Sequence, residues 1–555
     1  MHSKFLSDSN TFYRRYCPVL ILLLGALLRL LYLSRVPGGL HQDEAFVLLN
    51  SYDLLHEGRD SAGYAFPIYM SSWGDGQSAM YSWLLTPLLL LNKGIPTTFL
   101  GRLPQALVGI LTLWCVYCLV KEMFGHTAGL WTLFALSVCP WHIMACRWAL
   151  DANMAPGFLM FGLYFFVRGM NDNRYLLLAA LFYGLSLYCY AVIWPMLPIL
   201  LALQVCYGIR YHKIHCNRYS VLSVLLLFVL ALPLLLFVLV NQGLLPEIAL
   251  PWITIPKTQG YLVNQGLLPE IALPWITIPK TQGYRGGEIA FSLSSVYANF
   301  KNTAHLLLLQ DTGSPYDFLL PWGLFYDIGR VFILIGIGCM LYRLIRSVRQ
   351  HVFCWEFFLF AQLVGGGITS LLVTARMHQI NDLYIPLVLC EAYGIWKCSC
   401  LLKGKSQSLG RIFTGCTTAF FLICLVLFQK DYYTKYAETT NAYFSKGVED
   451  CVAYSMKQCK TLGLTTISAE KATQWPRLLL YTQTLPSQYL ATVTYDVAPA
   501  PAAFTTADGI RVNTRINYDT ISTDSIYIIY YTEADLFKDS FTLTPFYDWY
   551  VAVPK

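Results

Sequence analysis

Two adjacent acidic residues, Asp43 and Glu44, follow shortly after the first long apolar segment of the chain. They stand in the stretch His41-Gln42-Asp43-Glu44, where we expect a water-exposed loop to meet the membrane surface. Carboxylates in such a place can stay ionised beside a substrate that hangs from a lipid, and one of them can accept a proton from an attacking hydroxyl. Two solvated loop acids are the alternative interpretation.

Further charged and polar side chains occur in three segments between later apolar runs. They are His142, Arg147, Asp151 and Asn153 in the first, Arg376, His378, Asn381 and Asp382 in the second, and Lys257 or Lys280, Arg285, Glu288, Gln310 and Asp311 in the third. Carboxylates, histidines and arginines are therefore predicted to gather on one face of the membrane.

Each of these residues also has an ordinary structural explanation. An arginine such as Arg147 can extend its side chain from a helix end to the interface. An aspartate such as Asp151 is a favoured helix N-cap. His142, beside Trp141, could be an interfacial residue with one satisfied hydrogen bond. Because the membrane region contains few charges, their joint occurrence on one face favours a functional site.

The elements that position these residues are predicted to be membrane-spanning helices. The chain has 555 residues, of which 56% are hydrophobic and 13% charged, and its mean hydropathy is +0.48. Soluble proteins carry roughly 25% charged residues, and the apolar runs here have the length of about 17 to 25 residues that crosses a bilayer as a helix. We expect about eleven such helices, at 17–35, 98–120, 127–146, 154–169, 174–191, 192–207, 219–240, 325–342, 353–374, 382–397 and 411–428.

The distribution of charge predicts the orientation of these helices. Basic residues such as Arg343, Arg346 and Arg349 collect on one set of connections, whereas the first long loop on the other side is mainly acidic. Positive residues mark the cytoplasmic side. The sequence thus predicts a multi-pass protein of the cell membrane with a cytoplasmic N-terminus and an extracytoplasmic C-terminal tail.

The chain divides into two predicted domains. Residues 1–428 form a transmembrane domain with long outer loops at 36–97 and 241–324, the first of which ends in a short interfacial helix at Ala79–Leu91. Residues 429–555 form a small extracytoplasmic α/β domain. Its predicted elements are a helix at 440–461 and strands at 489–495, 509–514 and 525–531, which are rich in β-branched and aromatic residues.

The 17 cysteines lie mostly inside apolar runs, where they act as small hydrophobic residues. Cys451 and Cys459 in the tail could form a disulfide. Cys398 and Cys400 are weak evidence for a metal site, because no second ligand pair accompanies them.

One segment occurs twice in tandem, at Leu239–Tyr261 and Leu262–Tyr284, with identical sequences. Repeat folds need at least three units, so a recent duplication or an error in sequence assembly explains the pair better than a functional repeat. We expect one copy to occupy the structural position and the other to protrude.

This set of residues suits the transfer of a sugar from a lipid phosphate. A carboxylate can withdraw the proton of an acceptor hydroxyl while that hydroxyl attacks the anomeric carbon. The phosphate that leaves is anionic, and arginine, lysine or a cation can stabilise it. The sugar–phosphate bond supplies the driving force, and the sequence has no nucleotide-binding P-loop motif.

The Asp43-Glu44 pair resembles the acidic motif of the C-type glycosyltransferases, especially protein O-mannosyltransferases and bacterial aminoarabinose transferases. The stretch from Pro140 to Asn153 resembles the next outer loop of the bacterial members. The resemblance covers roughly residues 15–430 and includes Pro67–Tyr69, Gly76–Tyr81, Ile278–Lys280 and Arg376–Asn381.

The resemblance implies a polytopic α-helical C-type glycosyltransferase fold and an inverting hexosyl- or pentosyltransferase with a polyprenyl-phosphate sugar donor. It implies that Asp43 is the general base, that Glu44 supports it, and that Arg147 and Arg376 bind the phosphate. We place Asp151 with the catalytic group, and His142, His378, Lys280 and Arg285 with the donor site.

Metal dependence stays open, since no clear ligand set transfers from the family, and a divalent cation is one alternative. The acceptor could be a glycan, a lipid or a protein. The tail lacks the β-trefoil module of eukaryotic protein O-mannosyltransferases, so a protein acceptor is not implied. Besides the lipid bilayer and the donor no partner is predicted, and nucleic acid is not expected.

Two other functions stay open at this point. An enzyme similar to O-antigen ligases or polymerases would use a diphosphate-linked donor. A transporter would place charges at the membrane midplane on broken helices, whereas here the polar residues concentrate at helix ends, with Arg29 as the main exception.

Overall fold

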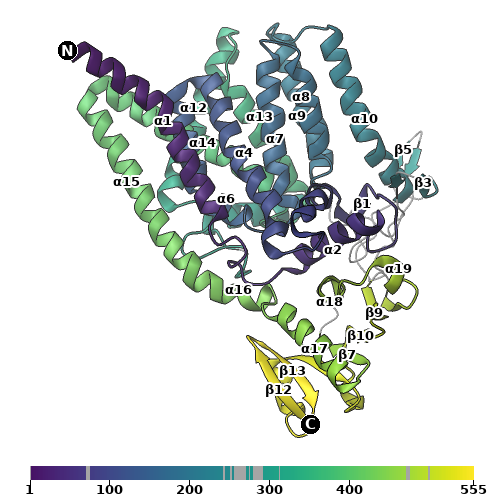
Figure 1. The fold of residues 1–555 in the computed structure, drawn as a ribbon. Helices are drawn as coiled ribbons and strands as arrows, with labels where there is room; N and C mark the ends of the chain where they lie inside the picture. The colour runs from purple at the N-terminus through teal and green to yellow at the C-terminus, as the bar shows by residue number, and fades with distance from the viewer. Residues whose placement is uncertain are drawn as a thin grey trace.

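The computed structural model describes residues 2–70, 76–241, 244–250, 253–255, 271–273, 276–278, 292–311, 313–470, 475–497 and 500–555. A bundle of helices forms one part of the molecule, and a mixed α/β domain lies beyond one end of this bundle, at the bottom of Figure 1. We call this end the domain side of the bundle.

Each of the predicted apolar segments forms a helix. Six helices of the described residues are long and apolar enough to cross a membrane, and the molecule is a multi-pass membrane protein. The helices of the bundle are α1 (His2–Leu30), α4 (Thr98–Phe124), α5 (His126–Val138), α6 (Pro140–Ala145), α7 (Ala155–Gly169), α8 (Tyr175–Ser186), α9 (Ile193–Arg210), α10 (Arg218–Asn241), α12 (Asp327–Gln350), α13 (Glu356–Leu372), α14 (Tyr384–Lys405) and α15 (Gln407–Asp431).

One predicted helix, at 127–146, is interrupted. Cys139 has an extended backbone (φ −63°, ψ 122°), and Pro140 starts the short helix α6. Proline lacks the backbone N–H that a continuing helix needs, but it fits the first turn of a new helix. The interruption turns the segment after Ala145 back across the domain side of the bundle.

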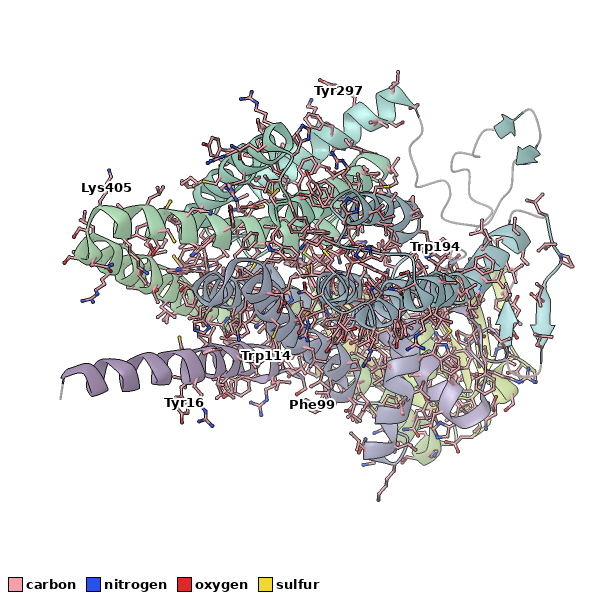
Figure 2. All side chains as sticks on the ribbon, turned by 90° about the horizontal axis from the view of Figure 1, so that it is seen from above. Tyr16, Phe99, Trp114, Trp194, Tyr297 and Lys405 are labelled. Atoms are coloured by element: carbon pink, nitrogen blue, oxygen red, sulfur yellow. The ribbon has the colours of Figure 1, made fainter. Side chains whose placement is uncertain are left out.

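The rim of the bundle is apolar and exposed. Seen from above, Tyr16, Phe99 and Trp114 lie along one edge of the helix array (Figure 2), and each is more than 40% exposed. Exposed aromatic and aliphatic side chains on membrane-spanning helices match the apolar tails of the lipids around them.

The first long loop folds back against the domain side. It forms helix α2 (Gln42–Glu57), the two-residue strands β1 (Tyr69–Met70) and β2 (Gln77–Ser78), helix α3 (Met80–Leu85) and the 3-10 helix η1 (Thr86–Asn92). The apolar segment predicted as an interfacial helix at Ala79–Leu91 is thus helical. Helix α2 is almost completely buried and places the acidic pair in its first turn.

The C-terminal domain contains a seven-stranded mixed sheet. The strand order is β12-β13-β11-β7-β10-β9-β8, with β7 parallel to both β10 and β11. The elements are η5 (Tyr432–Tyr436), α16 (Ala437–Tyr443), α17 (Val448–Leu462), β7 (Thr466–Ala469), α18 (Trp475–Thr482), α19 (Pro486–Tyr489), β8 (Thr494–Val497), β9 (Ala500–Thr505), β10 (Arg511–Asn513), η7 (Tyr518–Thr520), β11 (Ile526–Tyr530), η8 (Tyr531–Leu536), β12 (Phe541–Phe546) and β13 (Trp549–Pro554).

Several features of this domain correct the predictions for the tail. The strand expected at 489–495 begins only at Thr494, because Pro486 starts the short helix α19 and a turn follows it. The strands β7, β9, β12 and β13 were not predicted from the sequence. The disulfide between Cys451 and Cys459 is also wrong, since both thiols are free. The two residues lie eight positions apart on α17, which separates them by about 12 Å along the helix axis, too far for a bridge.

The two identical segments fold into separate hairpins. In the first copy β3 (Ile248–Leu250) pairs with β4 (Ile253–Ile255), and in the second β5 (Ile271–Leu273) pairs with β6 (Ile276–Ile278). The first hairpin docks on the bundle, because Ile68 N–H donates to the Thr254 carbonyl at 3.1 Å and Thr254 N–H donates to Phe66. Among the described residues, the second hairpin pairs only with itself. Helix α11 (Leu293–Leu309) follows.

Candidate active site

The acidic pair lies at the N-terminus of α2. His41 is the N-cap, and its side chain accepts a hydrogen bond from the backbone N–H of Asp43. The His41 Nδ1 atom lies 3.3 Å from a carboxylate oxygen of Asp43, whose side chain is 30% exposed. Helix N-termini favour negative charge. Asp43 is therefore the member of the pair that solvent or a substrate can reach.

Glu44 is fully buried and paired with Arg102. The Arg102 Nε donates to one carboxylate oxygen at 2.8 Å and its Nη2 to the other at 2.9 Å. The backbone N–H groups of His41 and Ala149 also donate to this carboxylate, at 2.9 and 2.8 Å. A bidentate pair with two further donors is the arrangement that compensates a buried charge. Glu44 consequently fixes the start of α2 rather than facing a ligand.

Arg102 also holds the chain that leads into α2. Its guanidinium donates to the carbonyls of Leu33, Pro37 and Gly39, the last two at 2.7 and 2.8 Å. Gly39 has φ +79°, and a side chain there would meet the backbone carbonyl of Phe444 at 2.3 Å. This connection therefore depends on a left-handed residue without a Cβ.

The predicted loops at 140–153 and 376–382 contact each other, and the first of them also contacts Glu44 through the N–H of Ala149. The side-chain amide of Asn381 donates to the Ala152 carbonyl at 2.8 Å, and Gln105 donates to the carbonyl of Asn153 at 2.9 Å. The Asp151 carboxylate accepts from Ser78 N–H at 3.0 Å and from Ala152 N–H at 2.8 Å. Asp151 is buried and stabilises the turn before α7, but it is not the N-cap that the alternative interpretation expected, because Met154 occupies that position.

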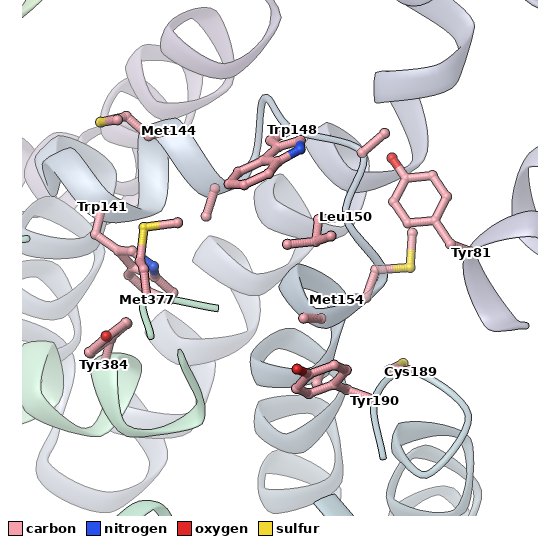
Figure 3. Packing of buried hydrophobic residues seen from close by; sticks show 14 of the residues in the cluster. Tyr81, Trp141, Met144, Trp148, Leu150, Met154, Cys189, Tyr190, Met377 and Tyr384 are labelled. Atoms are coloured by element: carbon pink, nitrogen blue, oxygen red, sulfur yellow. The ribbon is translucent and has the colours of Figure 1, made fainter. Parts of the chain in front are cut away.

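The two loops also carry apolar side chains that pack together. Trp141, Met377 and Tyr384 lie together, and Trp148, Leu150 and Met154 follow the segment that leads into α7 (Figure 3). The rings of Trp141 and Tyr384 meet edge to face with centroids 5.0 Å apart. Packing of this kind fixes the loops that carry the polar groups.

Arg147 does not face the candidate site. Its guanidinium is fully buried, and its five N–H groups donate to backbone carbonyls at the end of α1 and to the Tyr432 hydroxyl. The acceptors are Leu28, Arg29, Leu31, Tyr32 and Val36, at 2.7 to 3.4 Å, with Tyr432 at 3.1 Å. Helix ends leave such carbonyls without partners. Arg147 therefore caps α1, and a phosphate would have to displace these bonds, so we do not retain it as a phosphate ligand.

His142 is likewise committed within the bundle. Its Nδ1 lies 2.5 Å from Nη2 of Arg29. The guanidinium of Arg29 also donates to the carbonyls of Gly25, Leu136 and Ser137. An arginine can only donate, so the Nδ1 of His142 is an acceptor and the ring is neutral. Neither His142 nor Arg29 is placed to bind the donor.

The partly buried Tyr316 contacts the ring of His41, the N-cap of α2. Arg376 is exposed and His378 partly exposed. Burial raises the pKa of Tyr316 above its ordinary value, and this phenol also senses the charges of Asp43 and Arg376. The ring of His41 contacts those of Trp148, Tyr316 and Phe444, with centroids 5.1 to 5.7 Å apart. The N-cap of α2 thus lies among three aromatic rings, of which Trp148 and Phe444 are buried and Tyr316 is partly exposed.

Two of the predicted donor residues, Lys280 and Arg285, lie outside the described residues. Gln310 accepts from the N–H groups of Leu324 and Phe325 and stabilises a loop. Within the part of the chain that the structure describes, no group of three or more metal-binding side chains is close enough to hold an ion.

Sequence reasoning missed Arg102, Tyr316 and Phe444. Arg102 lies inside a predicted membrane helix, where a charged residue is itself a signal of a special role. Phe444 follows the last membrane helix and Tyr316 lies in a loop, so only the tertiary structure brings them to His41.

Comparison with known proteins supports the fold. The family model for dolichyl-phosphate-mannose-protein mannosyltransferase matches residues 77–237. Among the curated proteins none matches this sequence significantly. The apo crystal structure of ArnT from Cupriavidus metallidurans is similar, with a TM-score of 0.54 and 13% identity over 96% of this chain and 97% of that chain.

Two further solved structures align at lower TM-scores. ArnT bound to undecaprenyl phosphate aligns with a TM-score of 0.47 and 12% identity, again over 96% of this chain and 97% of that chain. The archaeal oligosaccharyltransferase AglB from Archaeoglobus fulgidus, in complex with an inhibitory peptide and a dolichol-phosphate, aligns with a TM-score of 0.46 and 11% identity over 85% and 64% of the two chains.

These findings confirm the predicted resemblance and fold class. The chain has a helical, multi-span fold like that of ArnT, with a C-terminal domain built on a mixed sheet.

Proposed function

We propose that this protein is a membrane glycosyltransferase that moves a sugar from a polyprenyl-phosphate donor to an acceptor hydroxyl. The observation that carries the proposal is the position of Asp43, a partly exposed carboxylate in the first turn of α2, within a chain whose residues 77–237 match the mannosyltransferase family model. The fold shared with ArnT supports the same class of reaction. On this proposal the domain side of the bundle is extracytoplasmic.

The proposed reaction is a single displacement at the anomeric carbon. Asp43 accepts the proton of the acceptor hydroxyl, the hydroxyl oxygen forms a bond to the anomeric carbon, and the bond from this carbon to the phosphate oxygen breaks. The lipid phosphate leaves with the electron pair, and the configuration at the carbon is inverted. Glu44 supports Asp43 indirectly, because its four hydrogen bonds hold the helix turn that carries Asp43.

Two further residues are proposed to contact the donor. Arg376 is exposed, its charge acts on the phenol of Tyr316, and it would balance the charge of the leaving phosphate. Tyr316 keeps its proton at neutral pH, since the ordinary pKa of a phenol is about 10 and burial raises it further, and its hydroxyl would donate a hydrogen bond to a phosphate oxygen. No step is assigned to a metal ion.

Replacing Asp43 tests the proposed chemistry. In membranes supplied with radiolabelled polyprenyl-phosphate sugars, Asp43→Asn is expected to reduce transfer about 10²–10⁴-fold, the usual contribution of a general base. Glu438→Gln is the control, since Glu438 is an exposed acid of the nearby helix α16. Transfer at the wild-type rate by Asp43→Asn would contradict the proposed function.

Replacing Arg376 tests the proposed donor site. Arg376→Ala is expected to weaken transfer about 10- to 100-fold, because one charge-assisted hydrogen bond to the phosphate contributes roughly 1.5–3 kcal/mol. The loss should appear in KM for the donor and should be partly recovered in Arg376→Lys. An unchanged KM in Arg376→Ala would exclude this residue as a phosphate ligand.

A further inference from the structure

A buried arginine of the C-terminal domain, Arg477 of helix α18, lies beside the helix turn that carries the acidic pair. Helix α18 packs against α2, and the ring of Trp475 meets that of Phe46 edge to face with centroids 6.0 Å apart. Arg477 is only 3% exposed. A side chain of the C-terminal domain is therefore buried directly beside the start of the helix that carries Asp43.

Arg477 binds the residue that precedes the N-cap of α2. Its Nε and Nη2 both donate to the Leu40 carbonyl, at 3.0 and 2.8 Å. On the other side of the same peptide group, the His41 N–H donates to Glu44 at 2.9 Å. The peptide between Leu40 and His41 is thus held from both sides, by Arg477 at its carbonyl and by Glu44 at its amide.

The charge of Arg477 also interacts electrostatically with the acidic pair. Burial lowers the pKa of Arg477 to about 10, and Tyr481, Glu44 and Asp43 oppose that effect. The guanidinium is still protonated at neutral pH. A buried cation of the C-terminal domain therefore lies where it senses both members of the acidic pair.

We infer that Arg477 is a positioning residue for Asp43, so that the C-terminal domain completes the active site instead of serving only as an appended module. This inference rests on the proposed function. Asp43 lies two residues beyond the N-cap, and its position depends on where the Leu40–His41 peptide is held. A displacement of about 1 Å at a reacting group can cost about 10²-fold in rate.

The test compares Arg477→Ala and Arg477→Lys in the full-length protein, with radiolabelled undecaprenyl-phosphate mannose as donor and undecaprenyl phosphate as a binding probe. Arg477→Ala is expected to lower kcat at least tenfold, while KM for the donor and Kd for undecaprenyl phosphate change less than about threefold. Lysine keeps the charge but has a single donor nitrogen, so Arg477→Lys should recover part of the loss. Arg511→Ala is the matched control, because Arg511 is an exposed arginine of the same domain.

A double-mutant cycle separates positioning from a general structural defect. If Arg477 acts through Asp43, Arg477→Ala has no further effect on the residual transfer of Asp43→Asn. Additive losses in the double variant would overturn the inference, as would a wild-type kcat in Arg477→Ala. Should Arg477→Ala not yield folded protein in detergent, the same comparison is made with Arg477→Lys, for which a wild-type kcat contradicts the inference.

The outcomes also separate this inference from the proposed function. Full transfer by Asp43→Asn overturns both. A large loss in Asp43→Asn together with unchanged transfer in Arg477→Ala overturns only the role of the C-terminal domain.

Discussion

Glu44 and Asp53 are carboxylates of the same helix, α2, and both are completely buried. Glu44, in the first turn, has a bidentate arginine and two backbone N–H donors. Asp53, near the other end of α2, has no hydrogen-bond partner for either oxygen among the described residues. Burial raises the pKa of Asp53 well above its usual value, and the charges of Asp60 and Glu57 raise it further.

This difference shows that burial alone does not determine whether a carboxyl group is paired or how its pKa shifts. The N-terminal end of α2 keeps a charged group in place by pairing it, whereas in the C-terminal half burial raises the pKa of the unpaired Asp53 and so favours its protonated form. Pairing costs less than leaving a buried charge uncompensated. The end of α2 that presents Asp43 is thereby the end held by hydrogen bonds, which suits the proposed role of Asp43 as a positioned base.

The largest expected effect comes from removing the partner of Glu44. Arg102→Met leaves a buried carboxylate uncompensated and should reduce the free energy of unfolding by about 3–5 kcal/mol. Transfer should fall as well, because the turn that carries Asp43 is released. Thermal unfolding in detergent measures the first effect. The double variant Glu44→Gln/Arg102→Met should be more stable than Arg102→Met alone; equal stability would mean that the ion pair is not what holds this end of α2.

An intermediate effect is expected at Asp53. Its raised pKa means that the folded protein binds a proton that the unfolded chain has released, so stability falls as pH rises from about 4 through the folded pKa. Asp53→Asn should remove this pH dependence and stabilise the protein above that range by about 1–2 kcal/mol. Unfolding midpoints at pH 5 to 9 provide the measurement. A variant with the same pH slope as the wild type would contradict the proposed protonation of Asp53.

The smallest effect is expected at Glu57, which raises the pKa of Asp53 from a partly exposed position. Glu57→Gln should move the stability loss of the wild type to lower pH, with a change in stability of about 0.5 kcal/mol or less. The carbonyl oxygen of glutamine can still accept the hydrogen bond from the Ser487 N–H, whereas the Ser487 hydroxyl, which donates to the other Glu57 oxygen, has to turn and accept from the glutamine amide. Loss of the entire pH dependence in this variant would show that Glu57, and not Asp53, is the titrating group.

The membrane-spanning helices follow from the sequence alone, whereas the surroundings of the acidic pair do not. The pair was expected in a water-exposed loop, but it lies in the first turn of helix α2, where Glu44 is fully buried. Apolar runs of sufficient length must be helical in a bilayer, because a helix satisfies its own backbone hydrogen bonds. This reasoning located the helix segments and the helical stretch at Ala79–Leu91. It failed where local signals were weak, as for the strands β12 and β13, whose pairing partners are defined only within the folded sheet.

Only the tertiary structure shows which charged side chains are exposed and which are bonded within the protein. Sequence patterns placed Arg147, His142 and Arg376 on one side of the membrane, but only the fold showed that Arg147 caps α1, that His142 contacts Arg29 and that Arg376 is exposed. The physical reason is that an arginine binds a helix end or a phosphate with the same donors, and long-range packing determines which acceptor lies within reach. The contact of Arg477 with Leu40 joins residues more than four hundred positions apart, so no local pattern could have predicted it.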